Sequence, residues 1–226
     1  MSQSRYDAYK DSGVAWLGQV PAHWELKRLK NCLRNKITDG PHTTPEFINE
    51  GIPFLSVDGI QNGELTFDKC RYISITDHQE FKKKAHPKRD DILMGKAAST
   101  GKIARVKVDF EFSIWSPLAL INLDLTVVNV CFMEYSLKSS LAQFQIEQLC
   151  TMNTQKNISM DEIPNIKLPL PPLAEQQAIA AFLVRECARI DALIERAEQA
   201  IVLLRERRSA LIAAAVTGQI RVGNEE

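Results

Sequence analysis

The chain has few of the features that define membrane, secreted or disulfide-rich proteins. Its apolar runs fall far short of the about 20 residues that a transmembrane helix needs. The polar start, MSQSRYDAYKDSG, contains no secretory signal. The cysteines are odd in number, scattered and without a C-x-x-C pair: Cys32, Cys70, Cys131, Cys150 and Cys187. These absences predict a cytoplasmic protein with reduced thiols, and they argue against a zinc site.

Sequence motifs of catalysis are also missing. The Asn-Pro-Pro-aromatic tetrapeptide of adenine methyltransferases does not occur, since residues 170–173 read Leu-Pro-Pro-Leu. Residues 95–103 are similar to a phosphate-binding loop, but their two glycines are one residue too far apart. In addition, Ile103 occupies the position of the Mg²⁺-binding Ser or Thr. We therefore expect a binding protein with no catalytic residue, no metal site and no cofactor of its own.

Charge is distributed unevenly along the chain. The formal net charge of the 226 residues is zero, and the apolar and charged fractions are those of an ordinary globular protein. Residues 81–107 nevertheless contain only two acids, Asp90 and Asp91, against nine basic residues: Lys82, Lys83, Lys84, Lys88, Arg89, Lys96, Lys102, Arg105 and Lys107. Such a basic block is typical of a surface that attracts phosphates, although a solvated surface is the simpler alternative.

One uninterrupted helical pattern covers residues 173–216. Apolar residues recur there at steps of four and three, and only Arg208 interrupts them: Leu183, Cys187, Ile190, Ile194, Ala197, Ile201, Leu204, Leu211 and Ala215. A stripe that repeats every 3.5 residues predicts a coiled coil with one partner helix. A helix of this length would extend about 60 Å, too far for a short domain to cover. A second helix, from this chain or another copy, is therefore needed.

The residues before this helix alternate β-rich segments with glycine-containing turns. We expect strands over residues 53–57, 65–74, 91–96, 102–108 and 112–123, and helices over 76–84 and 129–150. The first 24 residues look like a lead-in that packs on this domain through Trp16, Leu17, Val20 and Trp24. The predicted fold class is α+β. A mixed globular recognition domain covers residues 1–168, and a proline hinge with one long coiled-coil helix covers residues 169–226.

Three polar loops and part of the basic block are candidates for contact with DNA. The loops cover residues 38–45, 95–102 and 153–157, and their hydroxyl, amide and ammonium groups suit phosphates and base edges. Ordinary structural turns are the alternative at each position, and for His42 we favour a structural role over that of a general base. The candidate residues are Gly40, His42, Thr43, Thr44, Lys82, Lys83, Lys84, Lys96, Ser99, Thr100, Lys102, Asn153, Gln155, Lys156 and Asn157.

Several segments are similar to one known family. They are the lead-in at residues 9–24, the loop at 39–45 with residues 51–56, the segment 91–102, LPLPPLAEQQ at 168–177, and AVTG at 215–218. Together they resemble the specificity subunits of type I restriction–modification systems. The chain departs from the family at Pro41, Asp90 and Ala98, where Thr, Gly and Gly are usual. It also has one recognition domain and one long helix instead of two of each, and so looks like a half-length subunit.

The resemblance implies a non-catalytic subunit that binds a bipartite double-stranded DNA target and recruits modification (methyltransferase) and restriction subunits. S-adenosylmethionine, ATP and Mg²⁺ would belong to those partners. Because the second helix is absent, we expect an antiparallel homodimer built on Leu183, Ile190, Ile194, Ala197, Ile201, Leu204 and Leu211. Two alternatives are a DNA-binding regulator or decoy that pairs with a longer specificity subunit, and a coiled-coil scaffold that does not bind DNA.

Overall fold

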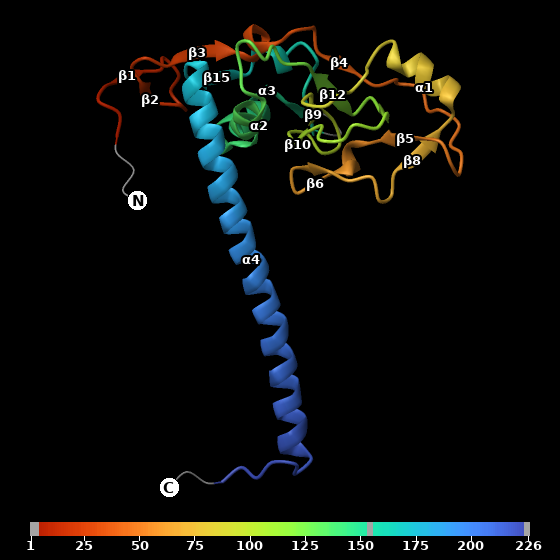
Figure 1. Cartoon of the computed structure of the whole chain (residues 1–226), viewed down its shortest axis with the longest axis vertical. Helices are drawn as coiled ribbons and strands as arrows, with labels where there is room; N and C mark the ends of the chain where they lie inside the picture. The colour runs from red at the N-terminus through yellow and green to blue at the C-terminus, as the bar shows by residue number, and fades with distance from the viewer. Residues whose placement is uncertain (1–4, 153–155, 224–226) are drawn as a thin grey trace. The chain divides into compact units, whose positions relative to one another are not determined.

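The computed structural model describes residues 5–152 and 156–223. It divides into two compact units, Met1–Ala180 and Ala181–Glu226. The first unit contains the described strands, the beginning of the long helix α4 (Leu173–Val216) and three shorter helices, which are α1 (Ile75–Lys82), α2 (Val130–Lys138) and α3 (Ser140–Leu149). This mixture of helices and strands with one long C-terminal helix confirms the α+β fold class (Figure 1).

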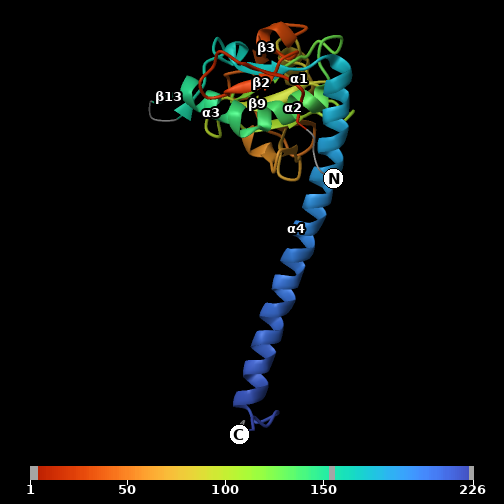
Figure 2. The same ribbon diagram turned by 90° about the vertical axis from the view of Figure 1, so that its left-hand side faces the viewer.

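A four-stranded antiparallel sheet forms the centre of the first unit. In spatial order its strands are β10 (Ile103–Arg105), β9 (Ile92–Gly95), β12 (Leu118–Ile121) and β4 (Thr38–Asp39). Successive residues of a strand point to opposite faces, so Met94 and Leu93 belong to two separate apolar cores. α2 and α3 lie beside β9 (Figure 2), and Phe132 and Ile146 from these helices join the core that contains Met94. Both faces of the sheet are therefore covered, which explains its continuous apolar strands.

The second face of the sheet is covered by shorter strands. β5 (Ile52–Leu55) pairs antiparallel with β8 (Arg71–Ile73) and parallel with β11 (Ser113–Ile114). A hairpin of β6 (Ile60–Gln61) and β7 (Glu64–Leu65) lies between β5 and β8 in the chain. Leu55, Ile60 and Ile114 from these strands join the second core.

The lead-in and the proline-rich segment both belong to the first unit. β1 (Tyr9–Asp11) pairs with β2 (Gln19–Pro21), and β3 (Glu25–Arg28) pairs with β15 (Lys167–Leu170). Val20 is buried, whereas Trp16, Leu17 and Trp24 are half-buried. In the first turn of α4, Glu175 accepts hydrogen bonds from the Tyr6 hydroxyl at 2.5 Å and the Trp24 indole at 3.1 Å. The first turns of α4 thus belong to the first unit, which extends to Ala180.

Three of the expected elements were wrong in part. The predicted strand over residues 112–123 is two strands of different sheets, β11 and β12, because residues 115–117 turn between them. The predicted strand over 65–74 is likewise interrupted between β7 and β8. The predicted helix over 129–150 is α2 and α3, separated by Ser139 in an extended conformation. The Ser139 hydroxyl accepts from the Ala142 N–H at 3.3 Å and so caps α3.

The long helix begins and ends where the periodicity predicts, at Leu173 and Val216. The carbonyl of Pro172 accepts the first backbone hydrogen bonds of the helix, from Glu175 and Gln176. In the second unit the predicted stripe is exposed, with Ile194 at 51% and Leu204 at 64%. Among the described helices, none is long and apolar enough to span a bilayer.

Candidate nucleic-acid interface

Two of the candidate loops lie at the same end of the four-stranded sheet. β4 ends at Asp39 and β9 ends at Gly95, whereas β12 begins at Leu118 beside Gly95. Because neighbouring strands are antiparallel, these positions share one edge. The backbone ties the loops together there, since the Lys96 N–H donates to the Pro117 carbonyl at 2.8 Å and the Ser116 N–H to the Pro41 carbonyl at 3.2 Å.

The third candidate loop, at residues 153–157, contacts the glycine-containing turn at residues 95–102. Ala97 forms an isolated β-bridge with Asn157, which belongs to the short hairpin of β13 (Thr151–Met152) and β14 (Lys156–Asn157). The Thr100 hydroxyl donates to the Lys156 carbonyl at 2.7 Å, and the Lys156 side chain pairs with Glu147. Asn153 and Gln155 lie outside the described residues.

A buried carboxylate joins three of the candidate side chains. Asp39, only 5% exposed, lies 2.5 Å from the Lys84 ammonium, 3.0 Å from the Lys96 ammonium and 3.2 Å from the His42 ring. Burial opposes ionisation of Asp39, but the two ammonium groups outweigh this effect and lower the pKa of its carboxyl. Lys96 therefore links the loop at residues 95–102 to the end of β4, and Lys84 links the segment after α1 to the same carboxylate. Close by, the backbone of Gly40 lies against Ile114, where a Cβ would meet the carbonyl oxygen at 2.0 Å.

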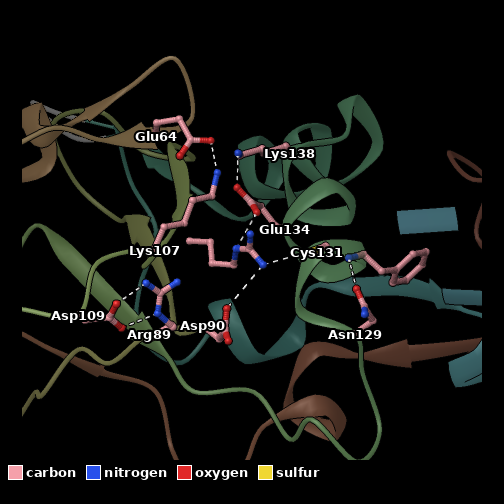
Figure 3. A network of polar contacts seen from close by, with 11 residues as sticks. Glu64, Arg89, Asp90, Lys107, Asp109, Asn129, Cys131, Glu134 and Lys138 are labelled. Atoms are coloured by element: carbon pink, nitrogen blue, oxygen red, sulfur yellow. Dashed lines mark hydrogen bonds and ion pairs between the residues drawn. The ribbon is translucent and has the colours of Figure 1, made fainter. Parts of the chain in front are cut away.

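The basic block is largely neutralised in space. Acidic residues, all but Asp90 from outside the block, pair with seven of its nine cations (part of this network is shown in Figure 3): Lys82 with Glu111, Lys83 with Glu80, Lys84 and Lys96 with Asp39, Arg89 with Asp109, Arg105 with Asp90 and Glu134, and Lys107 with Glu64. Of the nine cations of the block, only Lys88 and Lys102 have no carboxylate partner within the described residues. The net positive charge counted along residues 81–107 is therefore much larger than the unpaired positive charge that this block presents in the folded structure.

The glycine-containing turn is a tight connection between two strands. The Gly101 N–H donates to the Gly95 carbonyl at 2.8 Å, and Gly101 and Ala98 have φ angles of 88° and 62°. A phosphate-binding loop leads into a helix, whereas this turn leads into β10. Ser99 is half-buried and its N–H bonds within the turn, whereas Lys102 is exposed. Of the polar side chains of this turn, that of Lys102 is the exposed one.

The fold also assembles a Ser–His–Glu group that the sequence did not reveal. The His78 ring lies 2.8 Å from the Ser113 hydroxyl and 2.7 Å from the Glu111 carboxylate. These residue types form nucleophilic sites elsewhere, but Ser113 is only 1% exposed, so a substrate cannot reach its hydroxyl. The group instead fastens α1 to β11. In the described part of the chain, no three His, Cys, Asp or Glu side chains are grouped as metal ligands.

The chain matches one family model and several curated proteins. Residues 21–201 match the type I restriction modification DNA specificity domain. The StySPI specificity subunit of Salmonella potsdam is 28% identical over 208 residues, which cover 90% of this chain and 44% of that protein. The EcoBI specificity subunit of Escherichia coli is 22% identical over 203 residues, which cover 89% of this chain and 43% of that protein.

Solved structures share the fold. A chain from a structure of a type I R-M system, concerned with complex assembly and conformational transition, superimposes with a TM-score of 0.68 at 20% identity, covering 91% of this chain and 48% of that chain. The HsdS subunit from Thermoanaerobacter tengcongensis gives a TM-score of 0.56 at 20% identity, covering 82% and 41%. The chain thus spans less than half the length of these relatives. Because the family model matches most of its residues, the chain belongs to the type I restriction modification DNA specificity domain family.

Proposed function

We propose that this chain is the sequence-specific DNA-recognition subunit of a type I restriction–modification system. The observation that carries the proposal is the family match over residues 21–201, which covers most of the mixed domain and extends well into α4. The first unit would bind double-stranded DNA. Modification subunits would methylate adenine with S-adenosylmethionine, and restriction subunits would use ATP and Mg²⁺ to translocate and cleave DNA. This chain would contribute recognition and no catalytic step.

The loops at the end of the four-stranded sheet are the proposed DNA contacts. Side chains that bind phosphates or bases must be exposed and not already paired. Thr43, Thr44 and Lys102 meet both conditions in the described structure, and Asn157 is also exposed. In contrast, Lys84, Lys96 and Thr100 hold the loops in place through Asp39 and Lys156, which supports a positioning role for them.

Recognition of a bipartite target requires two DNA-binding domains. The exposed stripe of α4 supports an antiparallel homodimer, since apolar residues at seven-residue spacing need a partner helix. A two-fold symmetric dimer binds a two-fold symmetric site. The target would therefore be an interrupted palindrome, with half-sites separated by about one helical turn or about 34 Å.

A second apolar surface on α4 supports recruitment of the modification subunits. Four consecutive exposed residues, Ile201, Val202, Leu203 and Leu204, are apolar. A two-stranded coiled coil covers Ile201 and Leu204, which lie on the stripe, but Val202 and Leu203 lie outside it. The paired helices would thus retain an apolar surface, and a helix from a modification subunit is the partner that we propose for it.

Selection from a random duplex pool tests the proposal. The full chain, alone and mixed with modification subunits encoded in its own genome, should enrich one interrupted palindrome, and methylated adenines in the host should lie in the same motif. Thr43→Ala should weaken binding to the selected duplex by about 1–3 kcal/mol if Thr43 contacts a base, with little effect on random duplex. Enrichment of no sequence in either arm would refute DNA recognition by this chain.

A further inference from the structure

The hairpin of β6 and β7 presents two amide side chains on a turn of unusual backbone geometry. Its central residues, Asn62 and Gly63, have φ angles of 51° and 77°, as in a two-residue type I′ turn, for which Asn-Gly is the preferred sequence. Gln61 and Asn62 are both exposed. The Gln61 amide makes one long hydrogen bond, 3.4 Å to the Asp58 carbonyl, and the Asn62 amide has no partner among the described residues.

The tip of this hairpin is held in place from beneath. The Lys138 ammonium of α2 donates to the Gly63 carbonyl at 2.8 Å and is itself paired with Glu134 at 2.6 Å. Lys107, which follows β10, pairs with Glu64 on the other side of the turn (Figure 3). A Cβ at Gly63 would meet only the end of the flexible Lys138 side chain, so this glycine is needed mainly for its positive φ angle. The two amides are therefore presented on a pre-organised turn.

A hollow separates the hairpin from the glycine-containing turn. Its volume is about 350 Å³, and it is lined by Ile60, Gln61, Asn62, Gly63, Lys102 and Ile103. Lys102 is one of the two cations of the basic block that have no carboxylate partner in the described structure. An uncompensated ammonium group and two amides thus meet at one concave surface. An ammonium group suits a phosphate, and amides suit base edges.

We propose that the hairpin is a DNA-reading element, in which Lys102 binds a backbone phosphate and the amides of Gln61 and Asn62 read base edges in the major groove. A two-stranded ribbon fits the major groove, and the amide of Asn or Gln pairs with adenine through two hydrogen bonds. The rigid turn reduces the entropy lost on binding. This inference rests on the proposed function, because it needs DNA as the ligand.

The selection from random duplex, repeated with hairpin variants of the full chain, tests this element. Asn62→Gly removes the amide and keeps a residue suited to positive φ, whereas Gln61→Ala shortens the neighbouring side chain. Each substitution should remove the preference at one or two positions of the motif and lower affinity for the selected duplex about tenfold, with random duplex unaffected. Lys102→Gln should weaken binding to both duplexes and reduce the salt dependence by about one phosphate contact.

Matched controls separate these contacts from general effects. Gln79→Ala removes an exposed amide on α1, away from the hairpin (Figure 1). Lys88→Gln removes the other unpaired cation, which precedes β9 and so lies at the opposite end of that strand from Gly95. Neither should alter the motif or the salt dependence. An unchanged motif in Gln61→Ala and Asn62→Gly would overturn the inference and leave the proposed function intact. Equal losses on selected and random duplex would also overturn base reading.

Discussion

Two residues that the resemblance marks as departures from the family have positive φ angles. Ala98 and Asp90, at positions where the resemblance predicts glycine, have φ angles of 62° and 71°. Glycine adopts this region without penalty, and Asp tolerates it better than Ala does. Ala98 therefore adopts a conformation suited to glycine, at some cost in strain. The sequence alone flagged both positions, but it could not say that positive φ was the reason.

Contacts between distant residues were the least predictable feature at this scale. Residues 38–45 and 95–102 could be identified from composition, as loops rich in Gly, Pro and hydroxyl groups. That Asp39 binds both Lys84 and Lys96 could not, because sequence spacing contains no information on which sheet edge the loops share. The hairpin tip was similarly missed, although Asn62-Gly63 is a recognisable turn signal.

Glu111 gives a prediction about acid stability. A hydrogen bond from Lys82, together with a hydrogen bond from His78 and the nearby charge of His86, outweighs the effect of burial and lowers the pKa of its carboxyl from 4.5 to about 2. A carboxyl whose pKa is lower in the folded state contributes stability above pH 4.5, and that contribution is lost as the pH falls toward 2. Glu111→Gln should therefore flatten the fall in the free energy of unfolding across this interval. Urea unfolding at several pH values measures it, and parallel curves for both proteins would contradict the assignment.

At the scale of elements, local periodicity predicted more than strand propensity did. The bounds of α4 follow from a heptad pattern and from Pro172, both of which are local signals. The break between α2 and α3 also has a local signal, the serine cap at Ser139. The division of residues 112–123 into β11 and β12 has no local sequence signal of comparable strength. β11 pairs with β5 and β12 pairs with β9, so the division depends on strands that are distant in the sequence.

Gln176 yields the prediction for the junction of α4 with the first unit. This side chain is 1% exposed; it accepts from the Asn129 N–H at 2.9 Å and donates to the carbonyls of Val127 and Pro171 at 3.1 and 2.9 Å. Gln176→Leu would leave three backbone groups without partners, so it should lower the free energy of unfolding by about 2 kcal/mol or more. The neighbouring exposed Gln177→Leu is the matched control in chemical denaturation. Equal stability of the two variants would show that water replaces these bonds.

At the scale of the whole molecule, the exposed apolar stripe of α4 predicts the oligomeric state. Antiparallel helices place a position opposite d, and Ala197 of one copy opposite Ile201 of the other sets the register. All but one of the other stripe residues then also meet a stripe residue: Ile194 faces Leu204, and Cys187 faces Leu211. The exception is Ile190, which faces Arg208, the residue that interrupts the stripe. Sedimentation should therefore find a dimer. Ile194→Asp combined with Ile201→Asp should dissociate it, because each charge would be buried against an apolar partner.

Orientation and register can be tested with one native thiol. Under mild oxidation, a Leu211→Cys variant should form a disulfide-linked dimer through Cys187, because the antiparallel register brings these positions together. The same variant with Cys187→Ser should lose that link. A parallel pair would instead join Cys187 to itself in the unmodified chain.

Val202→Asp with Leu203→Asp, off the stripe, should leave the dimer intact and prevent binding of modification subunits. A stable monomer of the unmodified chain would rule out the homodimer, and with it the palindromic target.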